Sequence, residues 1–140
     1  ADESPVHSRY LVLEELMSAT TPGDLARMFA VVAATGDALG MAALYEQGGA
    51  LVGPDGVAVV GRKEIGDALT PMAESRPRVT ANITRTVIAG DIAVVYNDWT
   101  VKMADPDGGE MEVAGKAVEV CRLQADGTWL FVIDDPTARD

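Results

Sequence analysis

The chain has 140 residues, of which 22 are acidic and 11 basic, so its formal net charge is −11 at pH 7. This length is typical of one domain with a sizeable core. So strong a negative charge makes nucleic acid and anionic membrane surfaces unfavourable partners. One cysteine and one histidine are too few for a zinc site, and a single cysteine rules out an intrachain disulfide.

Two further observations concern location. No apolar run approaches the roughly 20 residues that a membrane-spanning helix needs. Residues 1–5 lack the basic start and apolar core of a secretion signal. We therefore expect a cytoplasmic protein with no membrane partner.

Helices are predicted for the first half of the chain. Apolar side chains recur every three or four positions over residues 9–18, 21–35, 38–45 and 61–74, and this is the period of an amphipathic helix. The second segment is preceded by Thr-Thr-Pro-Gly-Asp, in which a threonine N-cap comes before a proline in the first turn. Residues 1–8 are polar, and we expect them to be frayed.

Strands are predicted for the second half. Six runs have the apolar content or the alternation that is typical of strands: 50–52, 57–60, 79–89, 92–103, 113–123 and 128–135. Gln-Ala-Asp-Gly at 124–127 joins the last two runs as a hairpin. Because helices come first and antiparallel strands last, we predict an α+β fold with helices over one face of a curved antiparallel sheet.

Two acidic residues disturb the last hairpin. Glu119 lies on a face of small and apolar side chains, and Asp134 ends an apolar strand. An acidic side chain on a packed face is costly unless it has a partner or a function. Glu119 and Asp134 are therefore the first candidates for a functional site.

Several short motifs, in their order and spacing, resemble those of one protein family. They are Ala-Thr-Gly-Asp at 34–37 with Met-Ala-Ala-Leu-Tyr at 41–45, Gly-Arg-Lys-Glu-Ile at 61–65, Ala-Gly-Asp-Ile-Ala at 89–93 and Gly-Thr-Trp at 127–129. The set is similar to SnoaL-like and ketosteroid-isomerase-like proteins of the nuclear transport factor 2 superfamily. Within that superfamily it most resembles the SgcJ-type proteins of natural-product gene clusters.

The resemblance covers residues 22–136 and implies an organisation. It implies one SnoaL-like domain over residues 1–140, with an N-terminal extension at 1–20 and a core at 21–136. It also implies a cone, in which helices on the concave face of a bent sheet enclose one pocket and two copies pair through their convex faces. The fold alone does not define the function, because it hosts enzymes, binding proteins and adaptors.

The family's catalytic pattern is only partly present. Ketosteroid isomerases place their general-base aspartate directly before a proline after the first strand, and the matching residue here is Gly53. Their oxyanion-hole tyrosine matches Phe29, and their second oxyanion donor, an acid kept protonated, matches Glu119. The usual steroid isomerisation is therefore not expected, although one pocket acid remains.

The resemblance also implies which side chains face the pocket. It turns Val94, Tyr96, Asp98 and Thr100 inward on one strand, and Leu130, Val132 and Asp134 inward on the last. The candidate catalytic residues are Glu119, Asp98, Asp134 and Tyr96. The candidate ligand-binding residues are Phe29, Met28, Leu51, Met72, Val94 and Val132, and no metal ligand is expected. Several carboxyl groups in one apolar cavity raise one another's pKa, so one can stay a proton donor beside an ionised base.

Structural interpretations of the same residues stay open. Arg85, Lys116 or Arg122 could neutralise Glu119 in an ion pair. Asp98 and Asp134 could point into solvent, and Tyr96 could be a core aromatic residue with a satisfied hydroxyl group.

Two functions of different classes agree with the pattern. The first is a cofactor-independent acid–base enzyme, of the isomerase or cyclase type, that acts on a mostly apolar small molecule of polyketide or other natural-product biosynthesis. The second is a non-catalytic ligand-binding or dimeric partner domain. The cluster of acids favours the first function, and the missing base and tyrosine favour the second.

A homodimer is expected in either case. The residues expected to point outward form an apolar patch that a monomer would expose: Val95, Trp99, Val101, Val118 and Val120.

Overall fold

A computed structural model describes residues 19–140, so the polar start and the helix predicted over 1–18 lie outside the described residues. The described range forms three helices and seven strands. The helices are α2 (Pro22–Ala34), α3 (Ala38–Ala42) and α4 (Arg62–Glu74). The strands are β1 (Tyr45–Val52), β2 (Ala58–Val60), β3 (Arg78–Thr80), β4 (Ile83–Ala89), β5 (Ile92–Ala104), β6 (Glu110–Leu123) and β7 (Trp129–Asp135).

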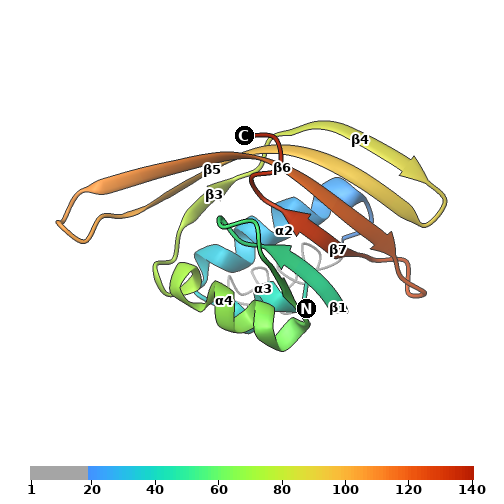
Figure 1. The fold of residues 1–140 in the computed structure, drawn as a ribbon, viewed down its shortest axis with the longest axis horizontal. Helices are drawn as coiled ribbons and strands as arrows, with labels where there is room; N and C mark the ends of the chain where they lie inside the picture. The colour runs from blue at the N-terminus through green and yellow to red at the C-terminus, as the bar shows by residue number, and fades with distance from the viewer. Residues whose placement is uncertain (1–18) are drawn as a thin grey trace, which may run out of the picture.

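The strands form one curved sheet, and the helices lie on its concave side (Figure 1). Neighbouring strands follow the order β2-β1-β7-β6-β5-β3, and β4 also pairs with β5. The predicted α+β fold is confirmed, with one correction. The sheet is mixed because β1 and β7 pair in parallel; they are far apart in the chain, so no hairpin forces them to run antiparallel.

Local structure differs from the sequence prediction at two places. Tyr45 begins β1 instead of ending a helix, because α3 stops at Ala42. The run predicted as one strand over 79–89 is divided into β3 and β4. At the break, the backbone N–H of Asn82 donates to the side-chain Oδ1 of Asn97 at 3.0 Å, in place of a regular strand hydrogen bond.

A β-bulge in β7 decides which of its side chains reach the concave face. Cys121 of β6 pairs with Phe131, but Val120 pairs with Ile133, so Val132 is an extra residue. Residues three apart on an unbroken strand point to opposite faces. The bulge therefore brings both Phe131 and Asp134 to the concave face.

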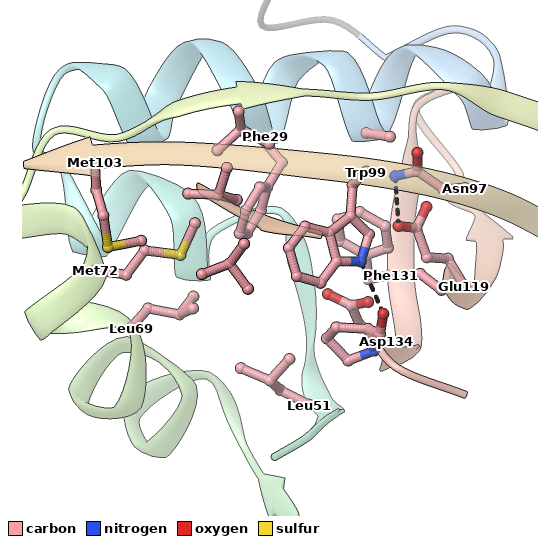
Figure 2. A pocket seen from close by; sticks show the side chains of 16 residues that line it. Phe29, Leu51, Leu69, Met72, Asn97, Trp99, Met103, Glu119, Phe131 and Asp134 are labelled. Atoms are coloured by element: carbon pink, nitrogen blue, oxygen red, sulfur yellow. Dashed lines mark hydrogen bonds between the residues drawn. The ribbon is translucent and has the colours of Figure 1, made fainter. Parts of the chain in front are cut away.

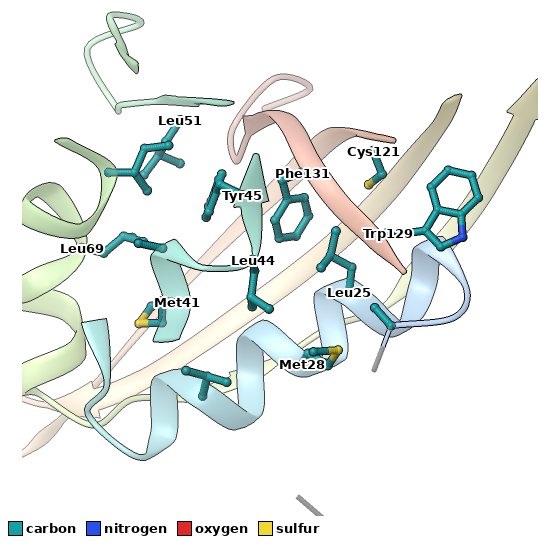
Figure 3. Close-up of a cluster of buried hydrophobic side chains, with 14 of the residues drawn as sticks. Leu25, Met28, Met41, Leu44, Tyr45, Leu51, Leu69, Cys121, Trp129 and Phe131 are labelled. Carbon is teal, nitrogen blue, oxygen red and sulfur yellow. The ribbon is translucent and has the colours of Figure 1, made fainter. Parts of the chain in front are cut away.

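The hydrophobic core lies between the helices and this face (Figure 3). Leu25 and Met28, three residues apart on α2, are both buried against the sheet. Phe131 is at the centre of the aromatic contacts, with its ring centroid 5.0 Å from that of Tyr45 and 6.4 Å from that of Phe29. These contacts attach β1 and α2 to the bulged strand.

The position of the Trp99 side chain depends on a glycine opposite it. Trp99 of β5 pairs directly with Gly115 of β6, and the indole lies where a Cβ at position 115 would be. From this position its Nε1 donates to the carbonyl oxygen of Pro136 at 2.7 Å. The absence of a side chain at Gly115 thus lets the indole pack flat against β6 and attach the end of β7.

Gly115→Ala is expected to destabilise the fold by about 2–4 kcal/mol, because overpacking costs about 1–3 kcal/mol and a lost hydrogen bond about 1 kcal/mol. The new Cβ would overlap the indole and lie 3.0 Å from the Pro136 oxygen. Chemical denaturation measures the change. Gly48→Ala is the matched control, since nothing lies within 4 Å of a Cβ there. Equal stability of the two variants would contradict this account of Trp99.

Candidate functional site

A cavity of about 300 Å³ lies between the helices and the concave face of the sheet (Figure 2). Most of its wall is apolar and includes Phe29, Leu51, Leu69, Met72, Trp99 and Phe131. Three polar side chains reach it from three neighbouring strands, namely Asn97 of β5, Glu119 of β6 and Asp134 of β7. The chemistry of this site depends on these three groups.

Glu119 is held in place by an amide and not by a cation. It is 5% exposed, and its Oε2 accepts a hydrogen bond from Asn97 Nδ2 at 3.1 Å. The orientation of the Asn97 amide is fixed because its Oδ1 accepts from the backbone N–H of Asn82. The other carboxyl oxygen, Oε1, is buried and has no hydrogen-bond partner among residues 19–140.

Asp134 is held by a tyrosine from β1. It is 7% exposed, and its Oδ2 accepts a hydrogen bond of 2.6 Å from the Tyr45 hydroxyl group. A second irregularity in strand pairing allows this contact. Tyr45 pairs with Phe131 and Ala50 pairs with Ile133, so residues 46–49 of β1 lie opposite the single residue Val132 of β7. Arg62 fixes the position of Tyr45 by donating two hydrogen bonds, of 3.1 and 2.7 Å, to its carbonyl oxygen.

Burial perturbs both acids. Burial and, after it, the negative charge of Asp134 together raise the pKa of Glu119 to about 8, against the effect of the Asn97 hydrogen bond. Burial also raises the pKa of Asp134 to about 6, against the hydrogen bond from Tyr45. Burial and Asp134 raise the pKa of Tyr45 well above its ordinary value, so its hydroxyl group stays a donor. Asp134 accepts a hydrogen bond from a hydroxyl group, whereas Glu119 keeps one oxygen without a partner among residues 19–140, so Glu119 is the member of the pair that favours the protonated form.

The ion-pair interpretation of Glu119 is wrong for the described part of the chain. No arginine or lysine there lies within salt-bridge distance of Glu119. Arg122 instead pairs with Glu46 at 3.1 Å, and Arg85 lies over the ring of Tyr96, 5.4 Å from its centroid. The two acids thus share the cavity with no compensating cation among residues 19–140.

The predicted orientation of β5 is wrong. Direct pairing of Asn97 with Ala117 and of Val95 with Glu119 places the odd-numbered residues of β5 on the concave face. Asp98 and Tyr96 are therefore on the convex face, and Asp98 pairs there with Arg139 at 2.7 Å. Both faces of β5 carry apolar side chains, so alternation could not decide between them. Neither residue belongs to the cavity.

Three of the six predicted ligand-binding residues line the cavity. Phe29, Leu51 and Met72 line the cavity, and their role in binding stays a prediction. Met28 is instead in the core. Val94 and Val132 do not line the cavity. Val94 points to the convex face of the sheet, and Val132 is the extra residue of the bulge.

Among the residues that the sequence analysis did not assign to the site, four shape its polar end. Asn97 and Trp99 were missed because the prediction turned them to the convex face of β5. Phe131 was missed because the bulge in β7 was not predicted. Tyr45 is 89 residues from Asp134 in the chain, and no local signal joins them. The Trp99–Gly115 pair could have been found, since a glycine opposite a tryptophan on adjacent strands indicates close packing.

Two absences apply to the described residues only. Between residues 19 and 140 there is no group of three His, Cys, Asp or Glu side chains placed to hold a metal ion. In the same range, no helix combines the length and the apolar character needed to cross a membrane.

A profile described as a SnoaL-like domain matches residues 25–132. The chain belongs to the SnoaL-like domain family. A comparison with curated proteins finds no match.

Solved structures show the same fold. An NTF2-like protein with a cystatin-like fold from Novosphingobium aromaticivorans is similar with a TM-score of 0.72 and 16% identity, over 99% of this chain and 91% of that chain. A ketosteroid isomerase-like protein from Erwinia carotovora atroseptica is similar with a TM-score of 0.66 and 19% identity, over 84% of this chain and 96% of that chain. These similarities confirm the predicted cystatin-like, NTF2-like fold.

The site of this SnoaL-like chain differs from the steroid-isomerase pattern where the sequence predicted it would. Gly53, at the position of the general base, is in the turn between β1 and β2 and does not line the cavity. Phe29, at the position of the oxyanion-hole tyrosine, lines the cavity but has no hydroxyl group. Among residues 19–140, the acidic side chains that line the cavity are Glu119 and Asp134.

Glu119→Gln is expected to stabilise the protein increasingly as pH rises. A buried acid with a raised pKa stabilises the fold fully below its ordinary value of 4.5, and this contribution is lost as pH rises to about 8. Glutamine does not titrate, so the variant gains about 5 kcal/mol over the wild type across this window.

Urea denaturation at several pH values measures this difference. Glu112→Gln, on the exposed convex face of the same strand, is the matched control and is expected to show no such slope. A loss of about 3–5 kcal/mol in Glu119→Gln at all pH values would indicate a buried ion pair and contradict this account.

Proposed function

We propose that the protein is a cofactor-independent acid–base enzyme of the isomerase or cyclase type, acting on a mostly apolar small molecule with a carbonyl group. Ionised Asp134 is the base that removes a proton next to the carbonyl. Protonated Glu119 is the acid that donates to the carbonyl oxygen as negative charge develops there. The catalytic residues are these two; Tyr45 and Asn97 position them.

One observation carries this proposal: two buried carboxyl groups reach one apolar cavity from adjacent strands, with no cation beside them in residues 19–140. Their environments push the two pKa values apart, with Glu119 above neutrality and Asp134 below it. Such a separation assigns one acid and one base at neutral pH. The assignment of Glu119 as the protonated donor follows the resemblance to ketosteroid isomerases and agrees with the geometry.

The substrate class is proposed from the wall of the cavity and from the family. Aromatic rings, thioethers and aliphatic groups favour an apolar molecule, as in polyketide and other natural-product biosynthesis. The resemblance of the sequence to SgcJ-type proteins of natural-product gene clusters supports the same substrate class.

A non-catalytic ligand-binding domain is the second candidate. The observation that favours it is the loss of the family's base and tyrosine at Gly53 and Phe29. In that case the two acids would only orient a bound molecule.

Exchange of carbonyl α-protons for deuterium distinguishes the two functions. In D₂O at neutral pH, the wild type is expected to accelerate loss of the α-proton NMR signals of 2-hexanone. Glu119→Gln and Asp134→Asn are each expected to lower the enzymatic rate about 10²–10⁴-fold.

Asp98→Asn is the matched control, because this acid is on the convex face and its removal should leave the rate unchanged. Binding of the ketone without exchange would favour the non-catalytic domain. An equal loss of rate in Asp98→Asn would contradict the assignment of the acids.

We also propose a homodimer through the convex face. Val95, Trp99 and Val101 were expected on this face, but they point to the concave side. A different row replaces them: Val87, Val94, Val120 and Ile133 pair directly across β4, β5, β6 and β7. Val87 and Ile133 are 44% and 43% exposed, and an apolar row across four strands favours contact with a second copy.

Ile133→Asp is expected to convert this dimer to a monomer, because it places a charge within the apolar row. Light scattering coupled to gel filtration at micromolar concentration measures the mass. Leu39→Asp is the control, since Leu39 is exposed on α3, away from the convex face. A monomeric wild type, or a dimeric Ile133→Asp, would overturn the proposal.

A further inference from the structure

The cavity has two chemically different ends. Asn97, Glu119 and Asp134 are at one end, and Met72 and Met103 are at the other (Figure 2). Met103 is six residues along β5 from Asn97, and Val113 is six residues along β6 from Glu119. At about 3.4 Å per strand residue, the two ends are about 20 Å apart.

The apolar end is open. Along the concave face of β6, Glu119 and Ala117 are buried, whereas Val113 and Met111 are 42% and 38% exposed. Figure 1 shows that this end of the β5–β6 hairpin extends beyond the helices. The cavity therefore opens between Met103 and Val113 onto a short apolar strip.

On the paired strands at this end of the hairpin the charged side chains are on the convex face, whereas Asp105 and Asp107 are in the loop that closes it. Met103 pairs with Met111 and Val101 with Val113 on the concave side, whereas Lys102 pairs with Glu112 on the convex side. On the concave face of the paired strands, a molecule leaving the cavity thus meets only side chains without charge as far as Met111. The acid end, in contrast, offers hydrogen bonds but carries the negative charge of Asp134.

We propose that the site binds an elongated, uncharged molecule, whose carbonyl group lies at Glu119 and Asp134 and whose apolar tail leaves the cavity between Met103 and Val113. This inference rests on the proposed function for the position of the carbonyl group. The position and the apolar character of the tail are inferred from the shape and chemistry of the cavity alone. An anionic head group is disfavoured, because it would lie beside two buried carboxyl groups with no cation from the described residues.

A series of 2-alkanones from six to fifteen carbons tests the tail, because the longest of them can extend from the acids to the open end. Calorimetry is expected to show a dissociation constant that falls about fourfold per added methylene, the fold-change that corresponds to about 0.8 kcal/mol per buried CH₂. Tetradecanoate, which has a similar chain but an anionic head, is expected to bind at least tenfold more weakly than 2-pentadecanone.

Val113→Asp places a charge in the path of the tail. It is expected to weaken binding of 2-pentadecanone at least tenfold and to leave 2-hexanone unchanged. Ala114→Asp adds the same charge to the next residue, which is exposed on the convex face, and is expected to change neither ligand.

Four results would overturn the inference: no binding of any 2-alkanone, no dependence on chain length, an equal effect of Val113→Asp on short and long ketones, or tetradecanoate binding as tightly as 2-pentadecanone. The deuterium exchange of 2-hexanone separates this inference from the proposed function. Exchange that depends on Glu119 without a length effect would retain the function and overturn the tail. A length effect without exchange would retain the tail and overturn the acid–base role.

Discussion

The site depends on one irregularity in strand pairing, the bulge at Val132 of β7. Without the extra residue, Phe131 and Asp134 would point to opposite faces. With it, Phe131 packs against Tyr45 in the core while Asp134 reaches the cavity beside Glu119. The irregular start of β1 complements the bulge, because it lets the Tyr45 hydroxyl group donate to Asp134. Two local departures from regular sheet geometry thus place a carboxylate where a regular strand would place an apolar residue.

As an electrostatic consequence, ionising both acids in this cavity has a high cost in free energy. Burial opposes charge on each carboxyl group, and neither has a cation beside it among the described residues. The two environments differ in one respect: Asp134 accepts from a hydroxyl group, whereas Glu119 accepts from an amide and keeps one oxygen without a partner. That unpartnered oxygen costs about 1–3 kcal/mol. A structure that retains such a cost at the polar end of an apolar cavity is typical of a functional site.

Much of the fold could be predicted from the sequence, because periodicity is a local property. The period of 3.6 residues located α2 and α4, and the alternation in 113–123 with the turn at 124–127 located the last hairpin. Glu119 was found because an acid interrupts an apolar face. The face of β5 could not be found in this way, because its neighbouring residues are apolar on both sides and only pairing with β6 decides between them. The bulge at Val132 and the contact from Tyr45 depend on partners distant in the chain, so no local pattern encodes them.

Titration of the two carboxyl groups by ¹³C NMR in the wild-type protein tests the central claim most directly. The claim is that the bulge buries Asp134 beside Glu119 without a cation. The account predicts that Asp134 titrates near pH 6 and Glu119 near pH 8, in that order. Titration of both groups near their ordinary values of 3.8 and 4.5 would contradict it, because it would show that solvent or a cation reaches them.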